Sequence, residues 1–545
     1  MAGALALALA TLASAPALAD PSTPAPFDIP ALHEEAAAAN LVHRYAGPWE
    51  HFVGGGVAAF DCNGDRRPDL LLAGGENEMA LFVNRSPVGG VLRFRRRALD
   101  LPERQRRRVI GAYPLDVDSD GLLDLFVLRV GGNLVLRGRG DCRFERANRR
   151  WNLDGGRAWS TAFAATWEAG ARHPTLAVGN YVDRSAPGSP FGTCEANALL
   201  RPASGDAPDY SRPQALLGHC TLSLLFTDWN GSGEPALRVS NDRQYHRGGQ
   251  EQLWRVSVGR PAREYRAGDG WRRLAIWGMG LAEVDLDLDG RPEYAATSMG
   301  DTKLQRLTRE GVDAERPQYE DIAFARGATA HQPYTGGDHR PSTGWHAQFA
   351  DVNNDARPDL FIAKGNVEAM GDFAALDPDN LLLMQPDGTF REAGGEAGIA
   401  LPRKGRGAAV VDLNMDGMLD LVVVNRGGPA SLFRNLGAAT AWGHRPLGNW
   451  LGVELDAGAV NRHGVGARIV VRTGNHVQSR TVQVGGGHAS GRAGFTHFGL
   501  GPAERATVRV RWPDGAWSHE YRVFGGNFVV LRRDAAEARY WYPVD

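Results

Sequence analysis

The sequence predicts an all-β protein in which a seven-bladed β-propeller is followed by a small β-sandwich or barrel. Two observations predict this fold. Short acidic loops recur between strand-like runs at spacings of roughly 50 to 66 residues, a period typical of propeller blades. After Trp450 the chain changes to runs that alternate apolar and polar residues, as half-buried antiparallel strands do. We expect the propeller over residues 25–440 and the second domain over residues 445–533.

The acidic loops share one composition. In the loop from Asp116 to Asp124, carboxylates stand at positions one, three, five and nine, and Gly121 stands at position six. Calcium takes six to eight oxygen ligands at about 2.3–2.6 Å, so a short loop must turn alternate side chains inward and add a backbone carbonyl near position seven. The pattern therefore predicts a loop folded around one calcium ion.

Five loops keep these offsets, and each lies between a small or apolar segment and a strand-like run. The repeating unit is therefore a strand, a cation loop and a second strand. We predict about five calcium ions with a mainly structural role, because each ion would cancel the repulsion among the carboxylates of its loop. The predicted ligands are Asp61, Asn63, Asp65 and Asp69; Asp116, Asp118, Asp120 and Asp124; Asp285, Asp287, Asp289 and Glu293; Asp351, Asn353, Asp355 and Asp359; and Asp412, Asn414, Asp416 and Asp420.

Two weaker copies complete the series of seven. The loop from Asp228 to Ala236 has alanine in place of the ninth carboxylate, so we expect it to hold calcium poorly. The segment from Thr166 to Thr175 has the right place and a following strand but no ligand set, which predicts a metal-free blade. Seven units predict seven blades.

The repeats resemble the FG-GAP/VCBS repeats of integrin alpha-chain propellers. In the second domain, Gly464-Val-Gly-Ala-Arg468, Gly485-Gly-Gly-His-Ala-Ser490, His497-Phe-Gly-Leu-Gly501 and Val510-Arg-Trp-Pro-Asp-Gly515 resemble the ASPIC/UnbV domain. The combination is similar to bacterial homologues of cartilage acidic protein. The resemblance implies the fold and the calcium sites more directly than any activity.

The two ends of the chain differ from its body. Residues 1–19 are rich in alanine and leucine and end in Ala17-Leu-Ala19, which predicts an export signal cleaved at a small-x-small site. This stretch is too short and too alanine-rich to favour a transmembrane anchor. We therefore expect a periplasmic or secreted protein. The tail, residues 534–545, contains Tyr540-Trp-Tyr542, aromatics that either seal it onto a groove or leave it loose.

Four cysteines, Cys62, Cys142, Cys194 and Cys220, permit two disulfides and three possible pairings in an exported chain. Cys194 and Cys220 bracket an insertion rich in Pro, Asp and Ser, which favours their pairing and leaves Cys62 with Cys142. Closing such a loop stabilises by roughly 3–4 kcal/mol in the chain-entropy model. No Cys-x-x-Cys spacing supports the alternative of a zinc site.

Charge gives little indication of a partner. A net charge of −2 provides no overall attraction to nucleic acid or to an anionic membrane. The main local exception is a basic island, which is either a patch for an anion or polysaccharide or a solvated outer strand and turn. It comprises Arg93, Arg95, Arg96, Arg97, Arg104, Arg106, Arg107 and Arg108. Lysine occurs only at positions 303, 364 and 404, so arginine is the default cation and the solvated strand is favoured.

Two segments are longer than a blade turn requires, residues 329–342 and residues 366–379. The first contains His331 and His339 and leads to His346. Three histidines could form a transition-metal site or supply acid and base chemistry. Because no fixed ligand spacing links them, surface histidines are the simpler interpretation.

The leading functional hypothesis is an exported calcium-binding propeller that recognises a protein or glycan through its face loops, where binding residues usually lie. An alternative is a secreted polysaccharide lyase or hydrolase with a site over the central channel, built from His331, Tyr334, Asp338 and His339. The chain has no Gly-x-Ser-x-Gly or His-Glu-x-x-His motif, which argues against catalysis. A third hypothesis is an accessory role in natural-product biosynthesis, which the resemblance to UnbV implies.

Overall fold

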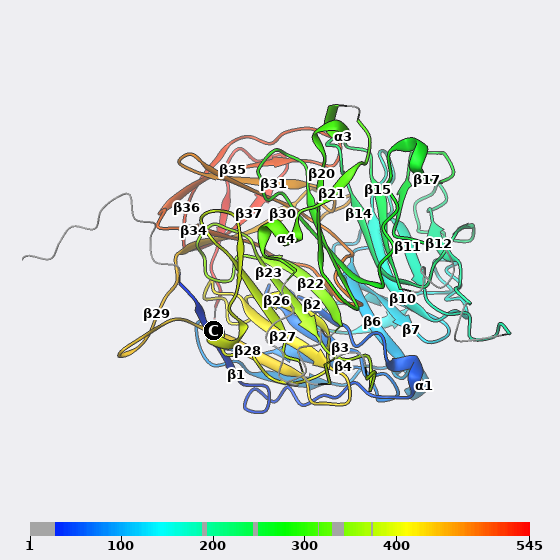
Figure 1. Ribbon diagram of the computed structural model, residues 1–545, viewed down its shortest axis with the longest axis horizontal. Helices are drawn as coiled ribbons and strands as arrows, with labels where there is room; N and C mark the ends of the chain where they lie inside the picture. Colours follow the sequence, from blue (N-terminus) through cyan, green and yellow to red (C-terminus); the bar gives the residue numbers. More distant parts are fainter. Residues whose placement is uncertain are drawn as a thin grey trace, which may run out of the picture.

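The structure is a computed structural model that describes residues 28–187, 193–242, 249–313, 315–329, 343–371, 374–375 and 377–544. These residues form nine sheets joined by turns and short helices (Figure 1). The helices are η1 (Trp49–His51), α1 (Glu103–Arg106), η2 (Ala267–Asp269), α3 (Arg309–Asp313), α4 (Ala323–Arg326) and α5 (Gly394–Ala397). Within the described residues, no helix is long and apolar enough to cross a membrane.

Seven of the sheets are built from the strands β1 to β28, and each contains four of these strands paired antiparallel. The first three consist of β2 (Val57–Phe60), β3 (Asp69–Leu72), β4 (Ala80–Asn84) and β5 (Phe94–Arg97); β6 (Val109–Leu115), β7 (Asp124–Arg129), β8 (Leu134–Gly138) and β9 (Phe144–Arg146); and β10 (Ser160–Thr166), β11 (Thr175–Asn180), β12 (Asn197–Leu200) and β13 (Pro213–Leu216).

The next three sheets repeat the arrangement. They consist of β14 (Thr221–Thr227), β15 (Ala236–Asn241), β16 (Gln252–Arg255) and β17 (Arg263–Glu264); β18 (Gly278–Val284), β19 (Glu293–Ser298), β20 (Lys303–Leu307) and β21 (Tyr319–Asp321); and β22 (Gly344–Ala350), β23 (Asp359–Lys364), β24 (Asn380–Met384) and β25 (Phe390–Glu392).

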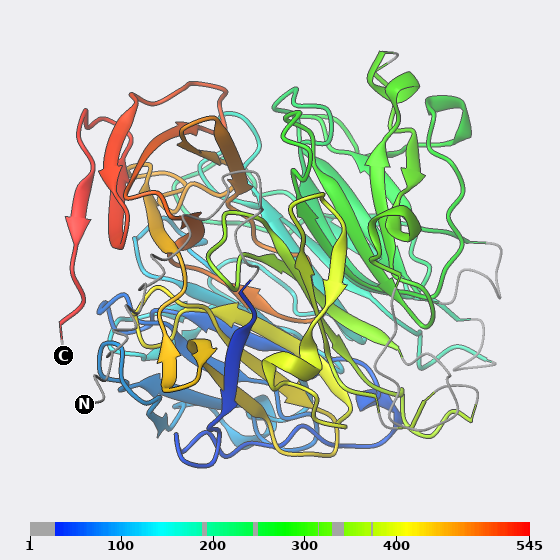
Figure 2. The ribbon, with the colours of Figure 1, turned by 60° about the vertical axis from the view of Figure 1, so that its left-hand side comes forward.

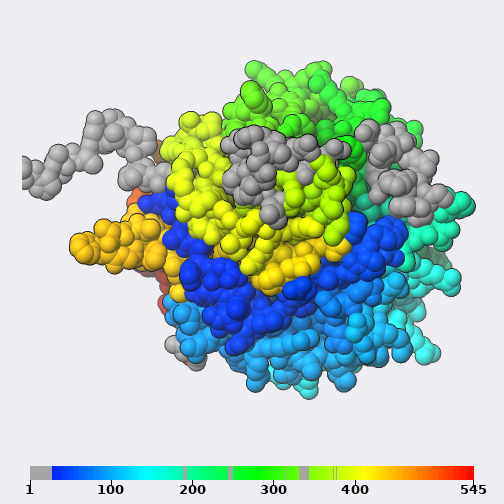
Figure 3. All heavy atoms as spheres, turned by 60° about the horizontal axis from the view of Figure 1, so that its bottom comes forward, coloured from blue at the N-terminus to red at the C-terminus, as the bar shows by residue number. Residues whose placement is uncertain are grey.

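The seventh sheet joins the two ends of the propeller sequence. It contains β26 (Gly405–Val411), β27 (Asp420–Asn425) and β28 (Ser431–Thr440), and its outer strand is the N-terminal β1 (Pro30–Glu34), which pairs antiparallel with β28. A short strand, β29 (Gly443–Arg445), extends β28 as a hairpin. Figure 3 shows the N-terminal residues, in blue, directly beside the yellow residues of this last sheet.

The first strands of the seven sheets form a closed ring. Each of β2, β6, β10, β14, β18 and β22 contacts the first strand of the next sheet, and β26 contacts β2. These strands are short apolar runs such as Ala162–Ala165, buried along their length, because neighbouring sheets cover both of their faces. The fold is therefore a β-propeller, as the repeat spacing predicts.

The C-terminal domain is a sandwich of two sheets around one core. The first sheet contains β34 (Thr496–Gly501), β30 (Asn449–Asp456), β37 (Asn527–Arg532) and β38 (Arg539–Trp541), and the second contains β32 (His476–Thr481), β31 (Arg468–Thr473), β35 (Arg505–Arg511) and β36 (Tyr521–Phe524). Leu451, Ile469, Phe498 and Val529 are among the buried residues between them. The tail is attached rather than loose, because β38 pairs with β37.

Residues 484–492 leave the sandwich and enter the centre of the propeller, and we call this segment the plug. Sequence patterning predicts a strand from Ser479 to Val484, but β32 ends at Thr481 and the chain then turns into the ring. At its end, β33 (Gly491–Arg492) pairs parallel with β2. In Figure 2 the C-terminal domain, coloured orange to red, lies to one side of the propeller, and its orange segment reaches in among the blades.

The plug contacts the first strand of every sheet in the ring. The Val57 amide of β2 donates to Ser490 Oγ (3.1 Å), and the Ala165 amide of β10 donates to the Val484 carbonyl (3.0 Å). Plug amides in turn donate to β14 and β18, from Gly486 to the Leu224 carbonyl (2.7 Å) and from Gly487 to the Leu281 carbonyl (2.6 Å). The remaining contacts are Ser490 with Ala112 of β6 and with Gly407 of β26, and His488 with His346 of β22.

Glycines in the ring make room for the plug backbone. A Cβ on Gly56 would lie 1.8 Å from the Ala489 carbonyl oxygen, and one on Gly111 would lie 1.9 Å from the same atom. Neither approach is possible for any other residue, since real Cβ contacts do not fall below about 3 Å without movement of the backbone. The triglycine Gly485-Gly-Gly487, expected to form a tight turn or bulge, therefore belongs to a segment packed inside the ring.

Both predicted disulfides are confirmed. Cys62 pairs with Cys142 and Cys194 pairs with Cys220. The first bond ties the loop between β2 and β3 to the turn between β8 and β9, and so links the first two sheets. The second closes the connection from β12 and β13 to the start of β14.

Candidate metal centres and the interdomain face

The predicted cation loops all connect the first strand of a sheet to its second strand. Because these strands are equivalent around the ring, the loops lie on one face of the propeller, which we call the loop face. Ligand oxygens of Asp116, Asp118 and Asp124 lie within 4.8 Å of one another, and those of Asp285, Asp287 and Asp289 do the same. The structure therefore gathers side chains that the sequence pattern predicts to be ligands of one ion.

The loops share a backbone conformation as well as a composition. Residues at position four have positive φ in four of the five loops although they are not glycine: Ser119 at 60°, Leu288 at 63°, Asn354 at 57° and Met415 at 58°. Position six also has positive φ, which explains Gly121 (86°), Gly290 (92°) and Gly417 (82°). Ala356 adopts the same conformation at 72° despite its Cβ. This shared left-handed geometry curls each loop around its own first carboxylate.

The first carboxylate organises each loop. Asp412 accepts the amides of Asp416 (3.2 Å) and Gly417 (2.8 Å). Asp351 and Asp116 accept the amides at the same two positions of their loops. The residue is thus held as an acceptor by its own loop while its remaining lone pairs face the centre of the turn.

The ninth carboxylate has a second role that the sequence pattern does not reveal. Asp420 is fully buried, and its two oxygens accept the amides of Leu413 in the loop and Asn435 in the third strand, both at 2.9 Å. Asp124 does the same with Val117 (2.7 Å) and Gly138 (2.9 Å). Position nine therefore joins the loop to the body of its blade, besides offering oxygen ligands.

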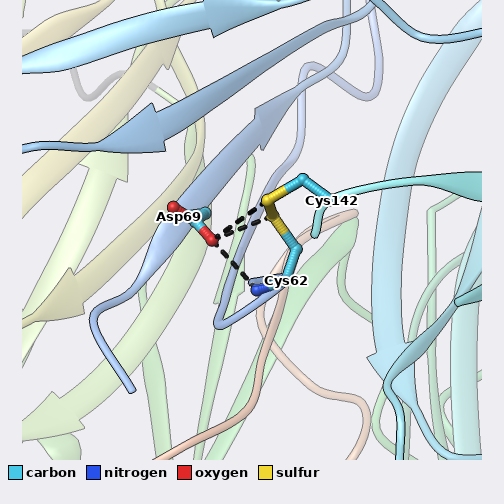
Figure 4. Close-up of side chains that lie close together, drawn as sticks. All are labelled: Cys62, Asp69 and Cys142. Carbon is cyan, nitrogen blue, oxygen red and sulfur yellow. Dashed lines mark hydrogen bonds between the residues drawn. A yellow bond between two sulfur atoms is a disulfide. The ribbon is translucent and has the colours of Figure 1, made fainter. Parts of the chain in front are cut away.

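In the first loop the ninth carboxylate also contacts the disulfide (Figure 4). Asp69 Oδ2 accepts the Cys62 amide at 2.9 Å and lies 2.9 Å from Cys62 Sγ. The sulfur contact is not a hydrogen bond, because a disulfide sulfur carries no proton. For the same reason Cys62 and Cys142 offer no thiolate, and among these three residues only Asp69 can be a ligand for a hard cation.

The electrostatics of the loops fit a bound cation. Burial is the first cause that raises the pKa of Asp116 to about 6, of Asp69 to about 7 and of Glu293 to about 8, and neighbouring loop carboxylates raise each of them further. Asp118 Oδ1, Asp285 Oδ1 and Asn414 Oδ1 are buried without a hydrogen-bond partner among the described residues. Crowded carboxylates and unpartnered oxygens at one point are what a calcium ion would satisfy.

Arginines supply part of the positive charge around the loops. Arg137 of β8 contacts Asp118 and Asp120 through their Oδ2 atoms, both at 2.5 Å. Arg468 of the C-terminal domain pairs with Asp285, and Arg511 lies 3.5 Å from Asp228 in the weak fourth loop. In that fourth loop, where the ninth carboxylate is missing, an arginine of the C-terminal domain thus pairs with the first carboxylate.

The C-terminal domain rests on the loop face. Besides Arg468 and Arg511, Glu454 pairs with Arg66 of the first loop at 2.6 Å, and His497 contacts Asn354 Oδ1 of the sixth loop at 2.8 Å. A Cβ on Gly417 in the seventh loop would overlap the ring of Trp450. The same loops that are predicted to bind calcium therefore form the surface on which the second domain docks.

The structure places the other residues singled out in the sequence as follows. His331, Tyr334, Asp338 and His339 lie outside the described residues. The basic island covers the outer strand β5 and helix α1; Arg93, Arg95 and Arg96 are exposed, whereas Arg106 pairs with Glu78 at 3.0 Å. His346 is buried on β22 inside the ring, away from any surface loop.

His346 and the plug residue His488 are neutral acceptors. His346 Nδ1 accepts the His488 amide at 3.1 Å, and His488 Nε2 accepts the Gly54 amide at 2.9 Å. Burial is the main cause that lowers the pKa of His346 to about 4 and that of His488 to about 3. A histidine held neutral in this way is a structural hydrogen-bond acceptor, not an acid or base in contact with solvent.

Comparisons with known proteins agree with this architecture. The geometry defines a propeller whose loop face carries a second β-domain, and residues 457–538 match the family model for ASPIC and UnbV. An ASPIC/UnbV domain is thus present at the C-terminal end. A segment of 121 residues is 37% identical to cartilage acidic protein 1 of Mus musculus and covers 21% of this chain and 17% of that protein. The match therefore spans about a sixth of the relative's length.

Solved structures resemble this chain only distantly. BBS1N in complex with ARL6DN covers 72% of this chain and 94% of its own, with 11% identity and a TM-score of 0.41. The Dos1 propeller covers 75% of this chain and 98% of its own, with 9% identity and a TM-score of 0.35.

We predict that His346 and the plug residue His488 make stability fall on acidification. Their folded-state pKa values lie below the ordinary 6.5, so the unfolded chain binds more protons and stability is lost as pH falls below 6.5. Between pH 7 and pH 5 the loss is about 2 kcal/mol for each histidine. Urea unfolding at both pH values should show a smaller loss for His488→Gln, whose side-chain oxygen still accepts a hydrogen bond. An equal loss in wild type and variant would contradict the assignment.

Proposed function

We propose that this protein is an exported propeller that calcium stabilises and that recognises a protein or glycan through one of its faces. A propeller fold joined to an ASPIC/UnbV domain suggests a recognition or scaffold module. The observation that carries the calcium part is the convergence of three carboxylates within 4.8 Å in the loop of Asp116 and in the loop of Asp285. At that separation like charges repel strongly unless a cation lies between them.

The calcium ions have a structural role in this proposal. Residues at positions one, three, five and nine are the side-chain ligands, and the carbonyl at position seven completes each set. In the first loop these are Asp61, Asn63, Asp65 and Asp69. Position nine joins four of the five loops to their third strands, through Asp69, Asp124, Asp359 and Asp420. Calcium would therefore stiffen both the blade and the surface on which the C-terminal domain rests.

Recognition is assigned to the face opposite the loop face, which we call the open face. Adjacent strands of a blade run in opposite directions, so connections from second to third strands leave from the edge opposite the cation loops. The long connections between β11 and β12, β15 and β16, and β23 and β24 are all of this kind. Their described parts adjoin one another, as when Tyr181 donates to Asp242. Long loops on a rigid scaffold are where binding residues concentrate.

Export is supported by the two disulfides, which persist in oxidising compartments and are rare in reducing ones. The predicted signal, residues 1–19, lies outside the described residues. The residues of the enzyme alternative, His331, Tyr334, Asp338 and His339, lie outside the described residues, and the further histidine singled out in the sequence, His346, is buried under the plug.

We expect a thermal melt of the mature protein to shift strongly between calcium and a chelator. Calcium at about 100 times its dissociation constant adds roughly 2.7 kcal/mol per site, so several sites give a large upward shift. Asp287→Asn should reduce this shift, because Asp287 is an exposed member of the fifth loop and little else depends on it. The matched control, Asp206→Asn, changes a fully exposed aspartate outside the loops. Equal melting in calcium and chelator would contradict the calcium proposal.

The recognition proposal is tested on the two exposed surfaces. Met370 lies in the connection between β23 and β24 and is 39% exposed, and Phe524 lies on the C-terminal domain and is 54% exposed. On a glycan array and a panel of extracellular proteins, we expect Met370→Glu to weaken binding of any ligand at least about tenfold, as loss of one interface anchor does. Phe524→Glu should leave it unchanged. Loss with Phe524→Glu alone would move recognition to the C-terminal domain.

A further inference from the structure

A cavity of about 250 Å³ lies between the loop face and the C-terminal domain. Its propeller wall is largely apolar and includes Leu115, Trp167, Phe349 and Val410. Gly140 and the exposed residues Arg143 and Arg462 also line it, so the cavity reaches solvent there. An apolar space with a few polar groups at one wall is the usual form of a small-molecule site.

The opposite wall carries cationic and amide donors from the segment that leads into and out of the plug. Arg480, Gln483 and Arg492 all line the cavity. Arg480 donates to the Ser479 carbonyl through Nη1 at 2.9 Å, but its Nη2 is buried without a partner among the described residues. The side-chain amide nitrogen of Gln483 is also buried without a hydrogen-bond partner among the described residues. These donors are available to a ligand and cost stability while they are unsatisfied.

Among these donors, Arg492 is the group most available to bind an anion. Within the described chain no carboxylate forms an ion pair with it and no acceptor takes a hydrogen bond from its guanidinium. Arg492 lines the cavity and is exposed by accessible surface, although it lies deep enough between the domains that desolvation lowers the pKa of its guanidinium. Arg480 lies close enough that Arg492 lowers its pKa as well, although burial is the larger cause of its value of about 10. Two guanidiniums thus line one space. Asp351 is the carboxylate that acts most strongly on Arg480, but neither arginine forms an ion pair among the described residues.

The carboxylates near the cavity do not balance this charge. Asp61, Asp116 and Asp412 line the propeller wall, but each accepts amides of its own loop. Glu454 is paired with Arg66 at 2.6 Å. Burying an unpaired guanidinium costs free energy that a bound anion with two oxygens can recover through bidentate hydrogen bonds.

We propose that this cavity binds a small organic acid whose carboxylate contacts Arg492 and Arg480 and whose apolar body lies against Trp167, Phe349 and Val410. The chemical class follows from the two walls, since an inorganic oxyanion would leave the apolar wall uncovered and a neutral apolar molecule would leave both guanidiniums unpaired. Gln483 supplies an additional donor. The ligand would be in contact with the propeller, the C-terminal domain and the base of the plug at once.

Benzoate, neutral benzamide and inorganic phosphate are suitable probes for calorimetric titration of the full chain in a buffer free of other oxyanions. We expect benzoate to bind at least about tenfold more tightly than benzamide or phosphate, as loss of a charged hydrogen bond or of apolar contact implies. Arg492→Met should weaken benzoate at least tenfold, and Arg95→Met, on the exposed outer strand β5, should not change it. Benzoate no tighter than benzamide would overturn the proposal, and phosphate tighter than benzoate would overturn the organic class.

A thermal melt shows whether Arg492→Met is simply misfolded. Without benzoate, the variant should melt at the temperature of wild type or above it, because it removes an unpaired charge from the space between the domains. Benzoate should raise the melting temperature of wild type and leave that of the variant unchanged. A variant that melts as wild type does and still gains stability from benzoate would show that Arg492 is not in the site.

Discussion

The plug is the contact on which the rest of the structure depends. Its backbone runs between the first strands of the seven sheets and forms hydrogen bonds with several of them. The Gly487 amide donates to Leu281 of β18, and the Val484 carbonyl accepts the Ala165 amide of β10. A propeller closed only by β1 and β28 has a central channel to fill, and here a segment of the second domain fills it. The two domains therefore share a core, and unpaired backbone groups at the centre of the ring gain partners.

This arrangement decides which face is free. With the plug inside the ring, the sandwich is held over the cation loops, where Glu454 meets Arg66 and His497 meets Asn354. Calcium in those loops would stiffen the docking surface and add positive charge close to the cavity that Arg480 and Arg492 line. The long connections leave from the other face. Under the proposed function, recognition of a partner and attachment of the second domain would lie on opposite sides of one scaffold.

Sequence alone predicts the parts of this structure that repeat or that pair locally. The offsets from Asp116 to Asp124 predict the loops and the strands beside them, and the insertion between Cys194 and Cys220 predicts their disulfide. It does not predict the plug, because Gly485-Gly-Gly487 has the composition of an ordinary turn and its partners come from seven distant strands. The sequence also cannot predict that Arg492 lacks an ion-pair partner, because its neighbours come from distant parts of the chain. The residues that could have indicated close packing at the centre of the ring are Gly56, just before β2, and Gly111, within β6.

The unfolding free energy of Gly56→Ala tests the packing of the plug most directly, with Gly268→Ala as the reference. Position 268 has open space around its Cβ and no positive φ, whereas a Cβ at position 56 would lie 1.8 Å from the Ala489 carbonyl oxygen. The account predicts a loss of about 1–3 kcal/mol or more for Gly56→Ala, as overpacking a rigid core costs, and almost none for the reference. Equal stability of the two variants would show that the plug does not occupy the ring as described.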